Sequence, residues 1–372
     1  MHVNKSNIKV LHVIHSLHIG GAENVVSLYA LHHTSRNFAV DICVFKAGGH
    51  IFNELAELGI RIHCLNTTSS SFSSFIKLLK LLKKEKYSVI HFHNPLPALW
   101  GIPAAILAKT PIKVLTEHSI YYKGRLGIAA YYYYFVRKFL NKIVTCSLQV
   151  KKSHLPRIGN IPNEVIYNGI DLDVYYPSSK NLELMKNLRI KKESIVLGHI
   201  GNLTPQKGQL ILLEAMKQVV SAANQTLLLI VGDGPLKNIL VSKAGELGIF
   251  DKVIFLGQRR DVPQILSLCD IVVGSSLREG FPMSVLEAMA TGKPVVTTDV
   301  GGNREAIESN ISGILVPVGD AKSLSMAVID LIVNKSKRER IGKEARRRVV
   351  EKFSIKKMIE DTENIYYQLI MN

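Results

Sequence analysis

The sequence predicts an α/β protein made of two doubly wound parallel sheets, each in its own domain. Short apolar runs alternate with helical patterns along almost the whole chain, at the spacing of βαβ units. Glycine-rich or polar turns follow several of these runs, where a strand would pass into a helix. The chain has 372 residues, which is more than one ordinary core holds, so two domains are expected.

The first domain opens with an apolar run at 8–14, followed by a turn with Gly20 and Gly21 and a helical pattern that extends to about His32. Strand, glycine-rich turn and helix in this order begin an open α/β sheet, in which ligands bind at the carboxyl ends of the strands. A glycine pair can also be purely structural, because glycine adopts positive φ readily. Further strands are expected at 40–45, 61–65, 89–93 and 113–117.

Histidines end two of these strands, at His91 and His93 and again at His118. A histidine at the carboxyl end of a strand faces the ligand crevice and titrates near neutral pH, so it can donate, accept or hold a hydroxyl. A core or surface position is the alternative for His91 and His93. The thirteen histidines show no HExxH or other metal-binding spacing, so no metal site is predicted.

A basic amphipathic helix is predicted between the third and fourth strands. Its apolar residues at helical spacing are Phe72, Phe75, Ile76, Leu79 and Leu82, and its lysines are Lys77, Lys80, Lys83 and Lys84. Such a helix can lie in a membrane interface, but it can equally cover a sheet with its lysines in water. A second segment, 126–138, places consecutive tyrosines beside cations, as interfacial segments do. Together the two segments favour contact with an anionic membrane surface.

Composition restricts the class of protein. Hydrophobic residues make up 47% of the chain and charged residues 21%, as in globular proteins. The four cysteines form no CxxC pair, which is typical of buried thiols in a reducing compartment. Since neither a signal peptide nor an apolar run of about 18 residues is found, we expect a cytoplasmic protein that does not span a membrane.

The formal net charge of +17 attracts phosphates of every kind. Nucleic acid, anionic lipid and a phosphate-bearing substrate are therefore candidate partners. No RNP, zinc-finger or basic-zipper pattern supports nucleic acid.

A polar stretch at 176–181 separates the two domains. The rhythm of strand, turn and helix restarts at 195–201, and further strands are expected at 226–231, 253–256, 271–273 and 295–298. The predicted domains are 1–175 and 190–352, and a last helix follows at 353–372. Neither GxxxxGK[ST] nor a GxGxxG after a strand occurs, so the sequence supports neither a P-loop nor a dinucleotide fingerprint.

Turns of the second domain carry residues that suit a phosphorylated ligand. Lys207 precedes a helix, where it can neutralise a diphosphate that helix N-termini also bind. Gly232 opens a tight turn, and the turn with Arg259 can present backbone groups to a base.

Two glutamates follow the strand at 271–273. Glu279 is expected on a loop, and Glu287 about a turn and a half into a helix that starts near Pro282. The unpaired N–H groups and the dipole of this helix start suit a phosphate. One pocket would then meet two carboxylates at different depths, a geometry that suits a sugar nucleotide. A surface loop capped by acids is the alternative.

The segment EGFPMSVLEAMATG, from Glu279 to Gly292, resembles the EX7E motif of family 4 of the retaining glycosyltransferases. Other short matches to this family occur in order along nearly the whole chain, among them GGAE from Gly20, TEH ending at His118, KG at Lys207 and GDG from Gly232. The resemblance implies the GT-B fold, in which two Rossmann-like domains face each other across a cleft. It also implies that the last helix, 353–372, crosses back to pack on the first domain.

The resemblance assigns donor-binding roles to the second domain. Glu279 would contact hydroxyls of the transferred sugar, and Glu287 those of the ribose. Lys207 would hold the diphosphate, together with N–H groups around Pro282, namely those of Phe281, Met283 and Ser284. The turns at Gly232 and Arg259 complete the expected nucleotide site.

Residues outside this segment receive roles as well. Gly20 and Gly21 would close on the diphosphate from the first domain, and His118 would lie near the reacting carbon on the acceptor side. The family commonly has an arginine where this chain has Asn202. This departure leaves Lys207 and the helix start to carry more of the phosphate charge, unless Arg278 or another cation substitutes.

The predicted function is retaining transfer of a hexose or N-acetylhexosamine from a nucleotide diphosphate sugar, with a UDP-sugar as the expected donor. A glycan or lipid-linked acceptor is implied, as in the synthesis of capsule or O-antigen, at the inner face of the plasma membrane. No cofactor is expected, because Lys207 and the helix start can stabilise the leaving diphosphate without a metal. A GT-B-like UDP-sugar epimerase is one alternative, and a basic nucleic-acid-binding protein, suggested by charge alone, is the other.

Overall fold

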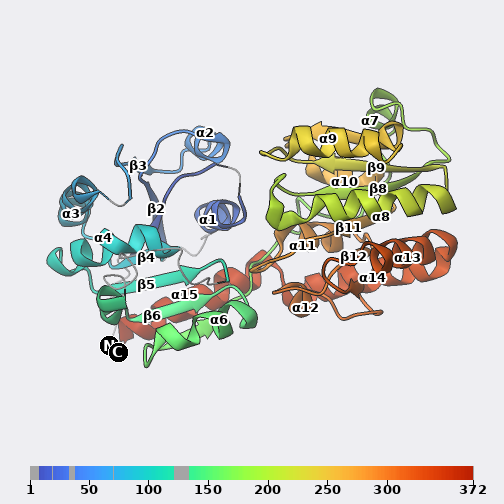
Figure 1. Cartoon of the computed structure of the whole chain (residues 1–372). Helices are drawn as coiled ribbons and strands as arrows, with labels where there is room; N and C mark the ends of the chain where they lie inside the picture. The colour runs from blue at the N-terminus through green and yellow to red at the C-terminus, as the bar shows by residue number, and fades with distance from the viewer. Residues whose placement is uncertain (1–7, 19, 33–37, 70, 121–133, 372) are drawn as a thin grey trace. The chain divides into compact units, whose positions relative to one another are not determined.

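A computed structural model of the chain describes residues 8–18, 20–32, 38–69, 71–120 and 134–371. The chain forms two compact units (Figure 1). The first unit comprises Met1–Gly169 together with Ile355–Asn372, and the second comprises Ile170–Ser354. Each unit contains one parallel sheet.

The first unit is built on a seven-stranded sheet in the order β3-β2-β1-β4-β5-β6-β7. Its strands are β1 (Ile8–Ile14), β2 (Phe38–Val44), β3 (Ile62–Cys64), β4 (Val89–His93), β5 (Ile112–Glu117), β6 (Lys142–Thr145) and β7 (Asn163–Val165). Its helices are α1 (Gly21–His32), α2 (His50–Glu57), α3 (Phe72–Glu85), α4 (Pro95–Leu107), α6 (Leu148–Ile158) and α15 (Ile355–Met371), with a 3-10 turn η1 (Arg137–Phe139).

Side chains alternate across this sheet, as the two-residue period of a strand requires. Leu11 and Val13 of β1 join a core that contains Leu78 of α3 and Ile102 of α4. The intervening residue His12 faces the other way and stacks on Tyr29 of α1, with ring centroids 5.0 Å apart. One face of the first sheet is therefore apolar under α3 and α4, while the other carries polar rings beside α1.

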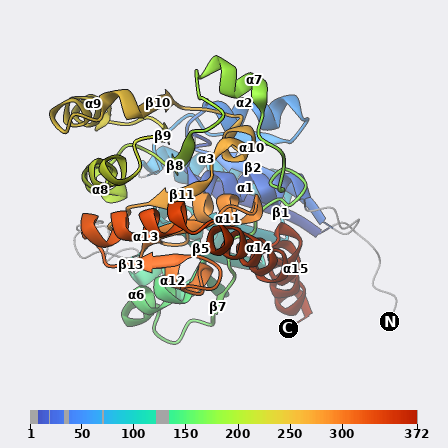
Figure 2. The ribbon, with the colours of Figure 1, turned by 90° about the vertical axis from the view of Figure 1, so that its right-hand side faces the viewer.

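The second unit has a six-stranded sheet in the order β10-β9-β8-β11-β12-β13. Its strands are β8 (Ile195–Ile200), β9 (Thr226–Val231), β10 (Val253–Gly257), β11 (Ile271–Gly274), β12 (Val295–Thr298) and β13 (Ile314–Val316). Its helices are α7 (Leu182–Asn187), α8 (Gln209–Ala222), α9 (Lys237–Glu246), α10 (Val262–Leu268), α11 (Met283–Ala290), α12 (Asn303–Ala306), α13 (Ala321–Val333) and α14 (Lys335–Lys352), with 3-10 turns η2 (Pro205–Lys207) and η3 (Phe250–Lys252). Helix α8 packs beside α13, and α11 beside α14 (Figure 2).

The strand order fixes where each sheet can bind a ligand. From β8 the chain moves outward to β9 and β10, and it then returns to place β11 on the other side of β8. The carboxyl ends of β8 and β11 thus flank a topological switch point, the usual ligand site of an open α/β sheet. In the first unit, β1 and β4 form the corresponding switch point.

The units divide at Gly169 and Ser354, whereas the sequence placed the limits at 175 and 352. The reason is a short pairing within the second unit, in which Ile170 N–H donates to Phe353 O at 2.9 Å and Ile170 bridges Ser354. Arg346 also donates to the carbonyl of Tyr175 at 2.8 Å. Helix α15 lies with the first unit, where it packs on α1 and β5.

Helix α3 buries a different set of side chains from the one that its sequence suggests. The buried residues are Ser74, Leu78 and Leu82, so Phe72 and Ile76 stay exposed, at 60% and 39% of their surface. Within the described residues, no helix combines the length and the apolar character that crossing a bilayer requires. Most of the predicted tyrosine segment, 126–133, lies outside the described residues.

Candidate active site

An ion pair between Lys207 and Glu279 lies at the switch point of the second sheet. Lys207 ends the turn η2 after β8, and Glu279 lies on the loop after β11. Lys207 Nζ donates to Glu279 Oε1 at 2.6 Å, and Ser276 Oγ donates to the same oxygen at 2.7 Å. A cation and a carboxylate from distant parts of the sequence are thus joined where a ligand would bind.

A glycine allows the two loops to approach this closely. Gly208, directly after Lys207, has a φ of +66°, and a Cβ there would overlap the carbonyl oxygen of Ser275. Ser275 Oγ in turn donates to Lys207 O at 2.9 Å. The β8 loop therefore rests directly on the β11 loop, which fixes the backbone of Lys207 beside Glu279.

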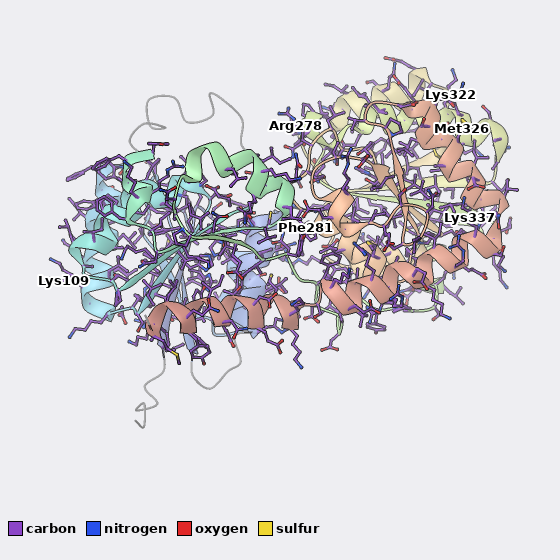
Figure 3. All side chains as sticks on the ribbon, turned by 90° about the horizontal axis from the view of Figure 1, so that it is seen from below. Lys109, Arg278, Phe281, Lys322, Met326 and Lys337 are labelled. Atoms are coloured by element: carbon purple, nitrogen blue, oxygen red, sulfur yellow. The ribbon has the colours of Figure 1, made fainter. Side chains whose placement is uncertain are left out.

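The start of α11 lies next to this ion pair. The helix begins at Met283, and Pro282 occupies the N-cap position, one residue outside the predicted first turn. Arg278 and Phe281 lie on the loop that leads into the helix (Figure 3). A Cβ on Gly302 would overlap Gly280 O and Phe281. This close packing holds the loop so that Ser284, in the first turn, lines the same pocket as Lys207 and Glu279.

Glu287 lies deeper on α11 and is 7% exposed. Burial raises the pKa of its carboxyl group to about 7. A hydrogen bond from Tyr175 and the charge of Lys207 act in the opposite direction and lower this pKa. Glu279 is also buried, at 8% exposure. The two carboxylates thus meet different partners: Glu279 a lysine and a serine, Glu287 a tyrosine.

The pocket is also lined by four polar residues that were not predicted: His199, Ser276, Thr297 and Asn303. His199 Nδ1 donates to Val273 O at 3.0 Å, and burial lowers the pKa of the ring to about 4. A neutral ring with its proton on Nδ1 leaves Nε2 as an acceptor, and this atom is buried with no partner among the described residues.

Asn303 complements His199 at the pocket wall. Its amide nitrogen donates to Thr298 O at 2.8 Å, while Oδ1 has no partner among the described residues. Like His93, both residues lie near the carboxyl end of a strand. His199 is the last residue but one of β8, and Asn303 begins α12, the helix after β12. The pocket they line is small, with a volume of about 20 Å³, which is room for about one water molecule.

Of the predicted donor-site residues of the second unit, Lys207, Glu279 and Ser284 line this pocket. The other seven do not: Asn202, Gly232, Arg259, Phe281, Pro282, Met283 and Glu287. Arg259 pairs with Asp261 through two contacts of 2.7 and 2.5 Å. Gly232 N–H donates to Gly257 O at 2.8 Å. Asn202, which stands where the family commonly has arginine, is exposed, and its carbonyl accepts from Gln209 Nε2 at 2.9 Å. Among the described residues, Lys207 is the one lysine or arginine that lines the pocket.

The remaining predicted residues belong to the first unit. Gly21 begins α1, and a Cβ on Gly20 would overlap the carboxylate of Glu23. His118 follows β5, where its backbone N–H donates to Asn94 Oδ1 at 3.4 Å.

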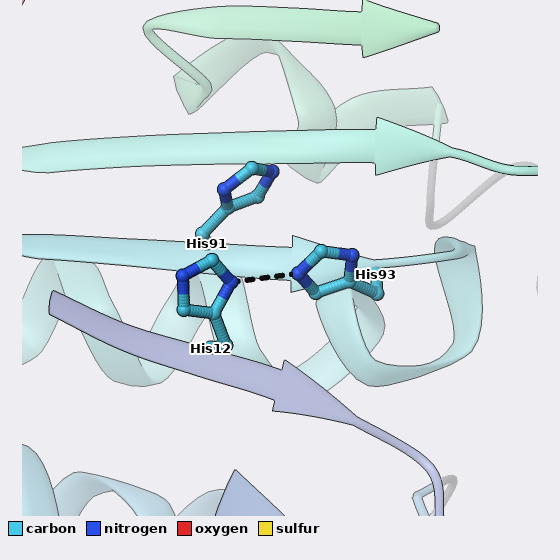
Figure 4. A group of neighbouring side chains, drawn as sticks. All are labelled: His12, His91 and His93. Carbon is cyan, nitrogen blue, oxygen red and sulfur yellow. Dashed lines mark hydrogen bonds between the residues drawn. The ribbon is translucent and has the colours of Figure 1, made fainter. Parts of the chain in front are cut away.

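Three buried histidines, His12, His91 and His93, gather on the same sheet as His118 (Figure 4). Each offers a ring nitrogen within 4.8 Å of the others. Sequence spacing could not reveal this group, because His12 is on β1 and the other two are on β4.

Residues 180–348 match the family model of glycosyl transferases group 1, and residues 19–174 match that of Glycosyltransferase Family 4. The chain is a family 4 glycosyltransferase. The UDP-Gal:alpha-D-GlcNAc-diphosphoundecaprenol alpha-1,3-galactosyltransferase of Escherichia coli is 29% identical to the transferase over 78% of each chain. The capsular polysaccharide biosynthesis glycosyltransferase CapM of Staphylococcus aureus is 26% identical over 76% of this chain and 77% of its own.

Solved structures agree with the fold of the transferase. Anabaena HepE, in complex with UDP and glucose, superimposes with a TM-score of 0.86 at 25% identity, over 97% of this chain and 100% of that chain. TarM superimposes with a TM-score of 0.77 at 14% identity, over 98% and 100%. The transferase therefore has the GT-B architecture of two Rossmann-like domains, and these relatives do not favour the epimerase.

Proposed function

We propose that the transferase moves a hexose or N-acetylhexosamine, with retention of configuration, from a UDP-sugar to a lipid-linked or polysaccharide acceptor. The observation that carries this proposal is the pair of Lys207 and Glu279 beside the start of α11, at the switch point of the second sheet. Support for the substrates comes from the relatives, which are named for a UDP-galactose donor, a diphosphoundecaprenol acceptor and capsular polysaccharide.

Binding of the donor would exchange partners within the ion pair. In the free protein, Glu279 neutralises Lys207. A donor diphosphate carries two negative charges and would draw the lysine ammonium to itself, helped by the N–H groups at the start of α11. Oxygen Oε1 of Glu279 is then released to accept hydrogen bonds from hydroxyls of the sugar. Two contacts to substrate would thus replace the contact between Lys207 and Glu279.

The chemical step requires stabilisation of the leaving UDP, since the bond from the anomeric carbon to the phosphate oxygen breaks as negative charge develops on that oxygen. Lys207 and the α11 amides would supply this stabilisation, so we propose that no metal takes part. The acceptor oxygen bonds to the same face of the sugar, and its proton passes to the departing phosphate oxygen. Retention then needs no carboxylate base.

The nucleoside end would be held by Glu287. An ionised carboxylate accepts hydrogen bonds from both hydroxyls of a ribose, and Tyr175 already donates a hydrogen bond to it in the free protein. The deeper position of Glu287 on α11 suits the ribose, while the loop position of Glu279 suits the transferred sugar.

A panel of nucleotides and nucleotide sugars, screened by thermal shift, tests the donor assignment. A ligand at 100 times its dissociation constant adds about 2.7 kcal/mol, which for a unit of this size is about 5 to 10 °C in Tm. We expect UDP and one or more UDP-sugars to give this shift, and GDP and ADP to give little. No shift with any nucleotide sugar would contradict the proposal. An epimerised UDP-sugar formed without acceptor would do so as well.

We also propose that the transferase works at the inner face of a membrane. Helix α3 supports this, because Phe72 and Ile76 are exposed at one end of the helix while Lys80, Lys83 and Lys84 are exposed along the rest. Exposed apolar side chains beside lysines bind anionic bilayers reversibly, at about 1 kcal/mol per lysine. The formal net charge of +17 would then serve lipid and phosphorylated substrates in place of nucleic acid.

Flotation with anionic vesicles at low salt tests the membrane proposal. We expect the triple variant Lys80→Glu, Lys83→Glu, Lys84→Glu to lose most of its binding, because about 3 kcal/mol of lipid attraction is removed and like charges are added. Lys77 is left intact, since its Nζ donates to Leu65 O at 2.7 Å.

A matched control changes three exposed lysines of α14 in the second unit, Lys335, Lys343 and Lys352, to glutamate. This variant has the same net charge as the α3 variant. If both variants lost binding equally, attraction would depend on total charge, and the role of α3 would be refuted.

A further inference from the structure

Three histidines of the first unit form a hydrogen-bonded chain that ends at His118. His12 Nδ1 lies 2.8 Å from His93 Nε2 (Figure 4), and His93 Nδ1 lies 2.9 Å from His118 Nε2. His12 and His93 are fully buried, and His118 is partly buried at the end of β5. Both ring nitrogens of His93 are therefore used within the chain.

The strand register creates this chain. His12 of β1 lies opposite His91 of β4, and His93 follows two residues later on the same face. His93 is paired across the next strand boundary with Thr116, two residues before His118. The ring of His93 stacks on His91 with centroids 4.6 Å apart and on His118 with centroids 5.2 Å apart. The three histidines, on β1, on β4 and directly after β5, thus form a row toward the carboxyl edge of the sheet.

The rings of His93 and His118 are neutral near pH 7. Burial, with the neighbouring histidines, holds the pKa of His93 well below its usual range. Burial also lowers the pKa of His118 to about 4. Each ring then carries one N–H and one lone pair.

Counting protons leaves only two arrangements of the chain. Each of the two hydrogen bonds needs one proton, and His93 can supply only one of them. If His93 donates from Nδ1 to His118, then His12 donates to His93 and all three rings carry their proton on Nδ1. If His118 donates to His93 instead, all three carry it on Nε2. With one proton on each ring, the three histidines therefore share one tautomer.

His91 is excluded from this chain although it stacks against it. Its Nδ1 lies 2.5 Å from Tyr366 Oη on α15, and its Nε2 lies 2.6 Å from Thr116 Oγ1. A metal ion bound by His12, His91 and His93 would have to displace one of these hydrogen bonds as well as one of the two that His93 makes. The hydrogen bonds between the rings and to these hydroxyls already account for the cluster, so we favour a proton-ordered chain over a metal site.

We propose that His12 and His93 are positioning residues that fix the tautomer of His118, and so decide whether its free nitrogen, Nδ1, offers the acceptor substrate an N–H or a lone pair. Nδ1 of His118 is buried and has no partner among the described residues, so its hydrogen-bonding capacity is not used within the chain. The inference rests on the proposed function for the acceptor, and on the family resemblance for placing His118 beside it. The ordering of the chain itself follows from its geometry.

Long-range ¹H–¹⁵N correlation spectra of protein labelled with ¹⁵N-histidine test the ordering at pH 7, because the two nitrogens of a neutral ring differ in shift. We expect His12, His93 and His118 to show the same neutral tautomer in the wild type. His93→Phe keeps a buried ring but cannot bridge, so the tautomers of His12 and His118 should change or become mixed. The matched control His91→Phe removes an equally buried ring from the same strand and should leave the shared tautomer unchanged.

Two activity readouts complete the test. Transfer to acceptor should fall about 10-fold in His93→Phe, as for one lost hydrogen bond, while UDP affinity stays at the wild-type value because UDP is assigned to the second unit. Unlike tautomers in the wild type, a charged ring, or equal effects of His93→Phe and His91→Phe would overturn the proposal. One equivalent of a bound divalent metal that shifts His12, His91 and His93 together would also overturn it. Absence of UDP binding in the wild type would refute the proposed function, but not a shared tautomer.

Discussion

Replacing Lys207 with methionine is expected to lower the rate of sugar transfer about 10²-fold to 10³-fold, the usual cost of removing one group that stabilises a leaving oxyanion. Methionine keeps most of the side-chain length and removes the charge. In the part of the chain that the structure describes, Lys207 is the one lysine or arginine lining the pocket, so its charge is not duplicated there. Initial rates at saturating UDP-sugar measure the effect, and calorimetry with UDP measures the accompanying loss of diphosphate binding.

Lys180 provides the matched control for this variant. Its Nζ lies 2.9 Å from Asp270, directly before β11, so it forms a similar partly buried ion pair at the opposite end of the strand that leads to Glu279. Lys180→Met should cost stability without slowing transfer. If Lys207→Met and Lys180→Met reduced the rate by similar factors, the effect of Lys207 would be structural and its assignment to the diphosphate would be wrong.

The fold could be predicted from the sequence because its strands are buried on both faces and therefore stand out as apolar runs. Strands β9 and β12 have the predicted bounds, 226–231 and 295–298. Strand β6 was missed, since its four residues, Lys142–Thr145, are too few to show a period. Apolar runs do not predict the switch points, because these depend on the order of the strands in the sheet, which is set by tertiary packing.

Local signals predicted part of the candidate site. A lysine before a helix and a glutamate beside a helix start marked Lys207 and Glu279, but only the strand order brings them within 2.6 Å. Arg259 was predicted to serve the nucleotide, and the structure pairs it with Asp261, two residues away, a contact that a turn prediction does not reveal. The sequence did not reveal the hydrogen bond of His199 or those that link His12, His93 and His118, because the partners in each bond lie on different strands or on the loops that follow them.

Changes at the two glutamates are expected to separate transfer from nucleotide binding. Glu279→Gln should lower transfer about 10²-fold, because a neutral amide stabilises the positive charge of the reacting sugar less well. UDP should bind equally well or more tightly, since Lys207 is released from its ion pair. Glu287→Gln should weaken UDP binding about 10-fold to 100-fold, the effect of losing charged hydrogen bonds to the ribose. The reverse pattern, measured by calorimetry with UDP and by initial rates, would contradict the division of roles.

The buried position of Glu287 also gives this residue a pH signature that distinguishes it from Glu279. Burial raises its pKa from 4.5 to about 7, so the folded protein holds a proton that the unfolded chain releases. Its contribution to stability is fully present below pH 4.5 and is lost as the pH rises through about 7. Glu287→Gln should therefore be more stable than the wild type above pH 7, by up to about 3 kcal/mol, and the difference should vanish below the unfolded pKa.

A bound ribose should lower the pKa of Glu287, because its hydroxyls favour the ionised carboxylate. Binding of UDP just below pH 7 would then release a proton from Glu287, and the binding enthalpy would depend on the ionisation enthalpy of the buffer. We expect this dependence in the wild type and in Glu279→Gln, and not in Glu287→Gln. Proton release that persisted in Glu287→Gln would place the titrating group elsewhere and remove Glu287 from the ribose site.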